Sequence, residues 1–227
     1  MAAAEDPWVR WDWVADHGGD IGAAVVDHVA LTLGSLLAGL AVSALLVAAV
    51  RRWPRLETPV LAGAGLLYTV PSVALFALLV PWTGLSPTSA VIGLTTYNLL
   101  VLVRSIVLGL EAVPGEVEEA ARGMGMTPAA RLWRVEVPLA LPVIAGGLRV
   151  AAVTTIGLVT VSALIGQGGL GQLILDGLVR DFRTPLVVGT TLSVVLAMAA
   201  DGALVAATRL LTPWSAGSGR IRGRPAP

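Results

Sequence analysis

The chain has 227 residues, of which 56% are hydrophobic and only 13% charged, and its mean hydropathy is +0.82. An ordinary soluble domain carries about 25% charged residues, so this composition excludes a soluble enzyme and indicates an integral membrane protein. Fifteen basic residues balance fifteen acidic residues, and the charge therefore gives no sign of a nucleic-acid partner. The absence of cysteine excludes a disulfide, a thiol nucleophile and a cysteine-ligated metal.

Five apolar segments organise the chain. They cover residues 25–50, 59–80, 88–110, 139–165 and 185–211, and each is long enough for the about 20 residues that a membrane-spanning helix needs. We therefore expect an all-α, polytopic membrane protein with about five transmembrane helices. Residues 1–22 are polar, lack the features of a signal peptide and contain a cluster of tryptophans typical of a membrane interface. This predicts an extracytoplasmic N-terminal segment (1–22), a transmembrane domain (23–211) and a disordered cytoplasmic tail (212–227).

Arginine is distributed unequally between the two sides of this arrangement. One side receives Arg51, Arg52, Arg55, Arg122, Arg131, Arg134, Arg220, Arg222 and Arg224, and the other receives Arg10, Arg180 and Arg183. Loops rich in arginine stay in the cytoplasm. We therefore expect the N-terminus outside the cell and the C-terminus inside, which agrees with an odd number of spans.

A charged stretch, residues 116–138, separates the third and fourth spans. Its length suits two short helices, because Gly123 and Gly125 end the first and Thr127-Pro128 favours the start of a second. Charged side chains are costly in hydrocarbon, so this stretch must face water. It is the core of a predicted cytoplasmic loop (111–138) on which another protein can bind.

Three ionisable residues lie inside the predicted spans: Arg104, Arg149 and Asp201. At 1.5 Å per residue, Arg149 and Asp201 both lie about 13–15 Å from the cytoplasmic ends of their helices. Equal depth predicts an ion pair between the fourth and fifth spans, which would hide both charges from lipid. In the alternative, each faces a water-filled vestibule without a partner. Arg104 lies only about 9 Å from its helix end and can extend to the headgroups.

Polar residues in the second and third spans are candidates for the solute path: Tyr68, Pro71, Ser72, Tyr97 and Asn98. A proline inside a helix frees a backbone carbonyl and kinks the helix, and neighbouring helices can accommodate such a kink in a membrane. Tyrosine and asparagine equally suit hydrogen bonds between helices, so both interpretations stay open for Tyr97 and Asn98.

The sequence GQGGLG follows the fourth span and satisfies the G-x-G-x-x-G spacing. A dinucleotide site would need a short strand before it and a βαβ unit around it, whereas a long apolar segment precedes it here. We predict a tight turn at the outer face, formed by Gly166, Gly168, Gly169 and Gly171.

No catalytic constellation is present, and His17 and His28 lack a third metal ligand. We therefore expect a subunit that is not an enzyme and needs no metal or cofactor. An ATP-independent channel or secondary transporter is an alternative, because Arg149 and Asp201 could serve an ion path. Five spans, however, do not divide evenly into the inverted repeats of many such proteins. The missing catalytic set also argues against a membrane-bound enzyme.

The charged stretch resembles the cytoplasmic motif of bacterial ABC importer permeases. That motif has Glu-Ala-Ala, three residues, Gly, nine residues, two aliphatic residues separated by one, and Pro. The matching positions are Glu119, Ala120, Ala121, Gly125, Val135, Val137 and Pro138. Residues 66–81, 118–151 and 163–178 are also similar to the permeases of osmoprotectant importers, which take up glycine betaine, carnitine or choline. The similarity covers about residues 20–211.

This resemblance implies a type I importer permease fold, similar to that of methionine permeases, in the bacterial cytoplasmic membrane. It also implies a second permease chain, identical or paralogous, together with two ATP-hydrolysing subunits and an extracytoplasmic solute-binding protein. Carried over by position, Glu119, Ala120, Ala121, Gly125 and Pro138 belong to the element that couples the permease to the ATPase. A different small solute, such as an amino acid, is the alternative cargo.

Overall fold

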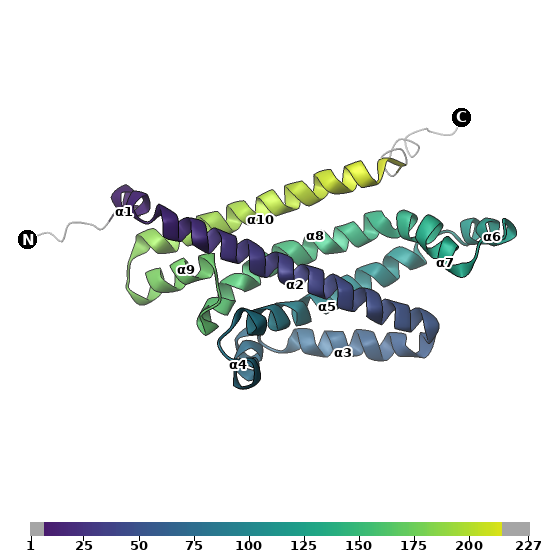
Figure 1. The fold of residues 1–227 in the computed structure, drawn as a ribbon, viewed down its shortest axis with the longest axis horizontal. Coiled ribbons are helices and arrows are strands. Elements are labelled where there is room, and N and C mark those ends of the chain that lie inside the picture. Colours follow the sequence, from purple (N-terminus) through teal and green to yellow (C-terminus); the bar gives the residue numbers. More distant parts are fainter. Residues whose placement is uncertain (1–6, 215–227) are drawn as a thin grey trace, which may run out of the picture.

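The computed structural model describes residues 7–214, and Figure 1 shows these as an elongated bundle of helices. Every regular element in this range is helical. In chain order the elements are α1 (Trp11–Asp16), α2 (Gly18–Arg52), η1 (Pro54–Leu56), α3 (Glu57–Thr69), α4 (Ser72–Thr83), α5 (Pro87–Glu111), α6 (Gly115–Gly123), α7 (Pro128–Arg131), η2 (Leu132–Glu136), α8 (Val137–Val161), η3 (Ser162–Ile165), α9 (Leu170–Val179) and α10 (Arg183–Leu211).

Four helical stretches are long and apolar enough to cross a membrane: α2, α5, the stretch from α7 to η3, and α10. The bent pair α3–α4 raises the number to five if it counts as one span. A helix satisfies its backbone hydrogen bonds internally, which hydrocarbon requires of any spanning segment. The prediction of an all-α, polytopic membrane protein is confirmed.

Helix α2 is longer than the apolar run that predicted the first span. Helix α2 begins at Gly18, so the predicted boundary between the N-terminal segment and the membrane domain at residue 22 falls inside it. Its 35 residues extend roughly 52 Å at 1.5 Å per residue, more than the about 30 Å of a bilayer core. The helix therefore continues beyond the apolar run, because the polar residues before residue 25 do not interrupt it.

The second predicted span is broken rather than kinked. Helix α3 ends at Thr69 and α4 begins at Ser72, and the two helices meet at 97°. Val70 and Pro71 are both extended between them, with ψ values of 128° and 132°. Proline disfavours the helical region for the residue before it and cannot donate a backbone hydrogen bond itself. The expectation of one continuous, kinked helix over 59–80 was wrong for this reason.

Helix α5 forms the centre of the bundle, where it packs against α2, α3, α4 and α8. Buried apolar clusters follow it along its length, centred on Leu94, Leu102 and Val103. Glycine allows close approaches here: the ring of Phe76 lies against Gly93, and Gly39 lies against Asn98. Close packing at small residues is how membrane helices associate when lipid removes the hydrophobic driving force between them.

The two ends of the bundle carry different elements (Figure 1). We call the end with α6 and α7 the motif end, and the end with α1, α9 and the glycine turn the opposite end. Helix α9 packs against α10, α2 and α8 and so forms part of the bundle. The predicted tail, 212–227, lies outside the described residues from position 215 onward.

Candidate functional site

The charged stretch at the motif end folds as two short helices, as its sequence predicted. Helix α6 ends at Gly123, and Gly125 continues the turn with φ +75°, a conformation that favours glycine. The hydroxyl of Thr127 then accepts a hydrogen bond from the backbone N–H of Ala130 (3.3 Å) and caps α7. This turn holds the two helices at an angle and projects them from the bundle (Figure 1).

The motif residues divide between the inner and outer sides of this loop. Ala121 is buried, whereas Glu119, Ala120 and Gly125 are exposed, and Pro138 is half-buried near the start of α8. Two large apolar side chains are also exposed on the loop: Met124 at 70% and Trp133 at 69%. An exposed surface that combines large apolar groups with charges is typical of a protein-binding site.

A buried ion cluster, which we call the Glu136 cluster, anchors this loop to the first span. The Glu136 side chain is 1% exposed, and its two carboxylate oxygens each accept from a different guanidinium. Arg131 Nε donates to Oε1 at 2.7 Å, and Arg51 Nη2 lies 2.6 Å from Oε2. Since Arg51 lies at the end of α2 and Arg131 lies in α7, the cluster connects the loop to a distant part of the chain.

Sequence reasoning missed the Glu136 cluster, since it treated Glu136 only as the variable position between Val135 and Val137. The five residues Leu132–Glu136 form a π-helical turn, and such turns are frequent at functional sites. A carboxylate just before an apolar helix, on the same side of the membrane as several arginines, was the available signal.

The candidates for the solute path fall into two groups. Tyr97 and Asn98 are buried contacts between helices: the Tyr97 hydroxyl donates to the Val70 carbonyl freed by the break, and Asn98 Oδ1 accepts from the Thr155 hydroxyl at 2.8 Å. Tyr68 and Pro71 are exposed, Ser72 is half-buried, and the Tyr68 ring meets the Tyr97 ring edge-on at 5.8 Å. The geometry of Tyr97 and Asn98 therefore favours the inter-helix interpretation.

Arg149 and Asp201 lie together between α8 and α10. Arg149 Nε donates to Asp201 Oδ1 at 2.8 Å and Nη2 donates to Oδ2 at 2.9 Å, which makes the pair bidentate. The two side chains are 39% and 37% exposed, and a hollow of about 380 Å³ opens onto them. Arg104 is exposed on α5 and is not part of this pair.

The glycine turn lies at the opposite end, beneath α2. Gly166 and Gly169 have positive φ angles (76° and 51°), and a Cβ built on Gly169 would lie 2.6 Å from the backbone nitrogen of His28. A Cβ on Gly171 would come similarly close to Thr160, and one on Gly168 would overlap Ala163. The turn therefore needs glycine both for its backbone conformation and for its approach to neighbouring helices.

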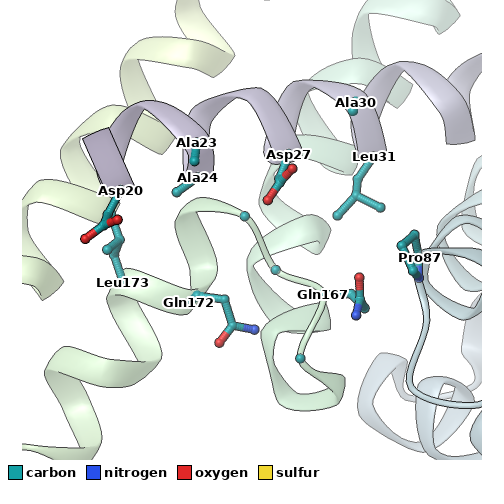
Figure 2. A pocket seen from close by; sticks show the side chains of 13 residues that line it. Asp20, Ala23, Ala24, Asp27, Ala30, Leu31, Pro87, Gln167, Gln172 and Leu173 are labelled. Atoms are coloured by element: carbon teal, nitrogen blue, oxygen red, sulfur yellow. The ribbon is translucent and has the colours of Figure 1, made fainter. Parts of the chain in front are cut away.

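A hollow of about 540 Å³ lies between α2 and the glycine turn. Figure 2 shows Asp20 and Asp27 of α2 on one side of it, with Gln167 and Gln172 on the other. Among residues 7–214, no group of three or more His, Cys, Asp or Glu side chains could hold a metal ion.

Long apolar helices with a charged, two-helix loop at one end are the architecture expected of a transporter's membrane subunit. Residues 30–211 match the family described as the binding-protein-dependent transport system inner membrane component, and the chain belongs to this family. It is thus a multi-pass membrane permease, and the expected family is confirmed.

Individual relatives agree with this assignment. The chain is 38% identical to the osmoprotectant import permease protein OsmW of Salmonella typhimurium, an alignment that covers 88% of this chain and 96% of the relative. It is 31% identical to the choline transport system permease protein OpuBB of Bacillus subtilis, covering 91% and 94% of the two chains. An inward-facing structure of the MetNI methionine ABC transporter has a TM-score of 0.72 at 21% identity and covers 83% of this chain and 94% of that one. The predicted methionine-permease-like fold is therefore confirmed.

Proposed function

We propose that this permease is the transmembrane subunit of an ATP-driven importer for a compatible solute: glycine betaine, choline, carnitine or a similar quaternary ammonium compound. The observation that carries the proposal is the loop of α6 and α7, which exposes Glu119 and Ala120 of the Glu-Ala-Ala motif, in a chain whose relatives are osmoprotectant and choline permeases. A channel that works without ATP would leave this loop without a role.

In this proposal an ATPase subunit binds the motif end. Glu119, Ala120 and Gly125 form the coupling surface, and the exposed Met124 and Trp133 side chains supply apolar contact area. Large aromatic and methionine side chains are enriched in protein interfaces. The permease itself does no chemistry, and ATP hydrolysis belongs to the partner. Closure of two ATPase subunits would move the loops and rock the spans as rigid bodies.

The remaining partners follow from the same assignment. The motif end faces the cytoplasm, as the arginine distribution predicts, and an extracytoplasmic binding protein delivers solute at the opposite end. A second permease chain, identical or paralogous, completes the path across the membrane. The binding protein provides high-affinity selection, and the permease needs only a weak, transient solute site.

The test is copurification of the permease with its cognate ATPase from co-expressing cells. The wild type should retain the ATPase in mild detergent, and Glu119→Lys should lose it, because the charge at the coupling surface is reversed. Glu111→Lys is the matched control, since it reverses the same charge at an exposed position at the end of α5, away from the face of α6 that carries Glu119 and Ala120. Equal ATPase recovery with Glu119→Lys and the wild type would contradict the coupling role.

A further inference from the structure

The Arg149–Asp201 pair lies in an unusual environment for charges inside a membrane span. More than a third of each side chain is left uncovered by the chain itself. Charges are costly in hydrocarbon and normally face a bundle interior or a water-filled cavity. This surface therefore faces water or another protein chain rather than lipid.

Open space surrounds the pair. The 380 Å³ hollow is lined by Gly146, Val150, Val153 and Thr154 in addition to the two charged residues. A second hollow, of about 260 Å³, continues along α8 and α10 toward Thr212 and shares Gly146 and Arg149 with the first. A Cβ added to Gly146 or to Gly202, next to Asp201, would meet nothing within 4 Å. Small-molecule sites have volumes of about 300–1,000 Å³, so the first hollow is large enough for a small solute.

The chemistry of the hollow matches one class of solute. A guanidinium binds a carboxylate through two parallel hydrogen bonds, and a carboxylate attracts a quaternary ammonium by charge alone. The side chains of Val150 and Val153 offer apolar surface for the methyl groups. Within the described residues, Arg149 and Asp201 have only each other as hydrogen-bond partners. A solute that carries the complementary charges therefore competes with this one ion pair and with no further hydrogen-bond partner of either residue in the described part of the chain.

We propose that Arg149 and Asp201 form a weak solute site in the transport path for a zwitterion that carries a carboxylate and a quaternary ammonium. The carboxylate of the solute pairs with Arg149, and its quaternary ammonium pairs with Asp201. Each protein charge exchanges one partner for another, so binding gains little free energy and the solute is easily released. A transport site must bind weakly enough to release its solute. This inference rests on the proposed function.

The experiment measures weak binding directly, by saturation-transfer NMR on the purified permease–ATPase complex without its binding protein. The probes are glycine betaine, which is a zwitterion, and choline, which has the same trimethylammonium group but no carboxylate. Arg149→Gln should weaken glycine betaine binding tenfold or more and change choline binding by less than twofold. Asp201→Asn should weaken both probes tenfold. Arg104→Gln removes an exposed intramembrane arginine outside the pair and should change neither.

Two results would overturn the site. One is an equal effect of Arg149→Gln on both probes, as expected of a pair that only holds α8 and α10 together. The other is recovery of wild-type binding of both probes by the uncharged double variant Arg149→Gln/Asp201→Asn, which removes both charges without leaving one unpaired.

Uptake into proteoliposomes with binding protein and ATP separates the two proposals. If the wild type imports either probe while binding is insensitive to Arg149, only the site fails. If the wild type imports neither these two probes nor carnitine, the proposed function fails as well.

Discussion

Removal of the Glu136 carboxylate should loosen the coupling loop from the first span. Glu136→Ala leaves two guanidiniums, Arg51 and Arg131, facing each other without the anion between them. Removing one partner of a buried ion pair typically costs about 3–5 kcal/mol. Arg51 and Arg131 are 38% and 18% exposed, and water can therefore offset part of this loss. We expect a decrease of about 2–3 kcal/mol in the free energy of unfolding, given this partial solvation.

The assay compares thermal unfolding of the purified complex with its coupling efficiency, the number of solute molecules imported per ATP hydrolysed. For a chain of this size, 1 kcal/mol corresponds to about 2–4 °C, so Glu136→Ala should lower the unfolding temperature by roughly 4–12 °C. Coupling should fall because the loop can then move without moving α2. Glu136→Gln keeps the shape and an acceptor oxygen and should have a smaller effect on both.

Glu118→Ala is the matched control on the same loop. Glu118 is half-buried and forms an ion pair with the exposed Arg122 one turn later, at 3.6 Å, and such i,i+4 pairs on a helix contribute only about 0.3–0.5 kcal/mol. If Glu136→Ala and Glu118→Ala were equivalent in unfolding temperature and in coupling, the anchoring role of the Glu136 cluster would be refuted.

Further predictions concern the bundle itself. Asp201→Ala should destabilise the complex more than Arg149→Ala/Asp201→Ala, because only the single variant leaves an unpaired charge. Thermal unfolding of both variants measures the difference, and additive effects of the two substitutions on stability would contradict the coupling between the two residues. Tyr97→Phe leaves the Val70 carbonyl without its hydroxyl donor and should lower the free energy of unfolding by about 1–3 kcal/mol, whereas Tyr68→Phe on the exposed neighbour should be close to neutral. Equal unfolding temperatures for the two variants would refute the role of this hydrogen bond. Gly169→Ala forces a Cβ against the His28 backbone at a positive φ and should cost more than Gly84→Ala. Gly84 has open space around it, but its φ of 71° and ψ of −177° belong to glycine, so that change should cost about 1–3 kcal/mol. Expression yield and unfolding temperature test the ranking.

The sequence predicted those features that depend on local pattern. Long apolar runs indicated the spans, and Gly123, Gly125 and Thr127-Pro128 predicted the two helices of the coupling loop. The positions of Arg149 and Asp201 along their helices predicted similar depths in the membrane, and the structure brings the two side chains together. Each of these inferences needs only the helical rise, residue conformational preferences and the cost of charge in lipid.

Features that depend on the arrangement of distant segments were not predictable in this way. The 97° break at Val70-Pro71 requires Tyr97 of another helix to satisfy the freed carbonyl, and a sequence pattern cannot show that partner. Glu136 is paired with Arg51, which lies 85 positions earlier. The start of α2 at Gly18 was likewise not predictable, because hydropathy marks the membrane portion of a helix and not its end.

ATP-dependent uptake in proteoliposomes tests the central claim most directly. The permease, its cognate ATPase and its binding protein would be reconstituted together, and entry of radiolabelled glycine betaine and choline measured with ATP and with a non-hydrolysable analogue. We expect uptake of at least one solute with ATP but not with the analogue, and loss of this uptake in Glu119→Lys but not in Glu111→Lys. Equal uptake with ATP and with the analogue, unaffected by Glu119→Lys, would contradict the importer assignment and favour an ATP-independent channel.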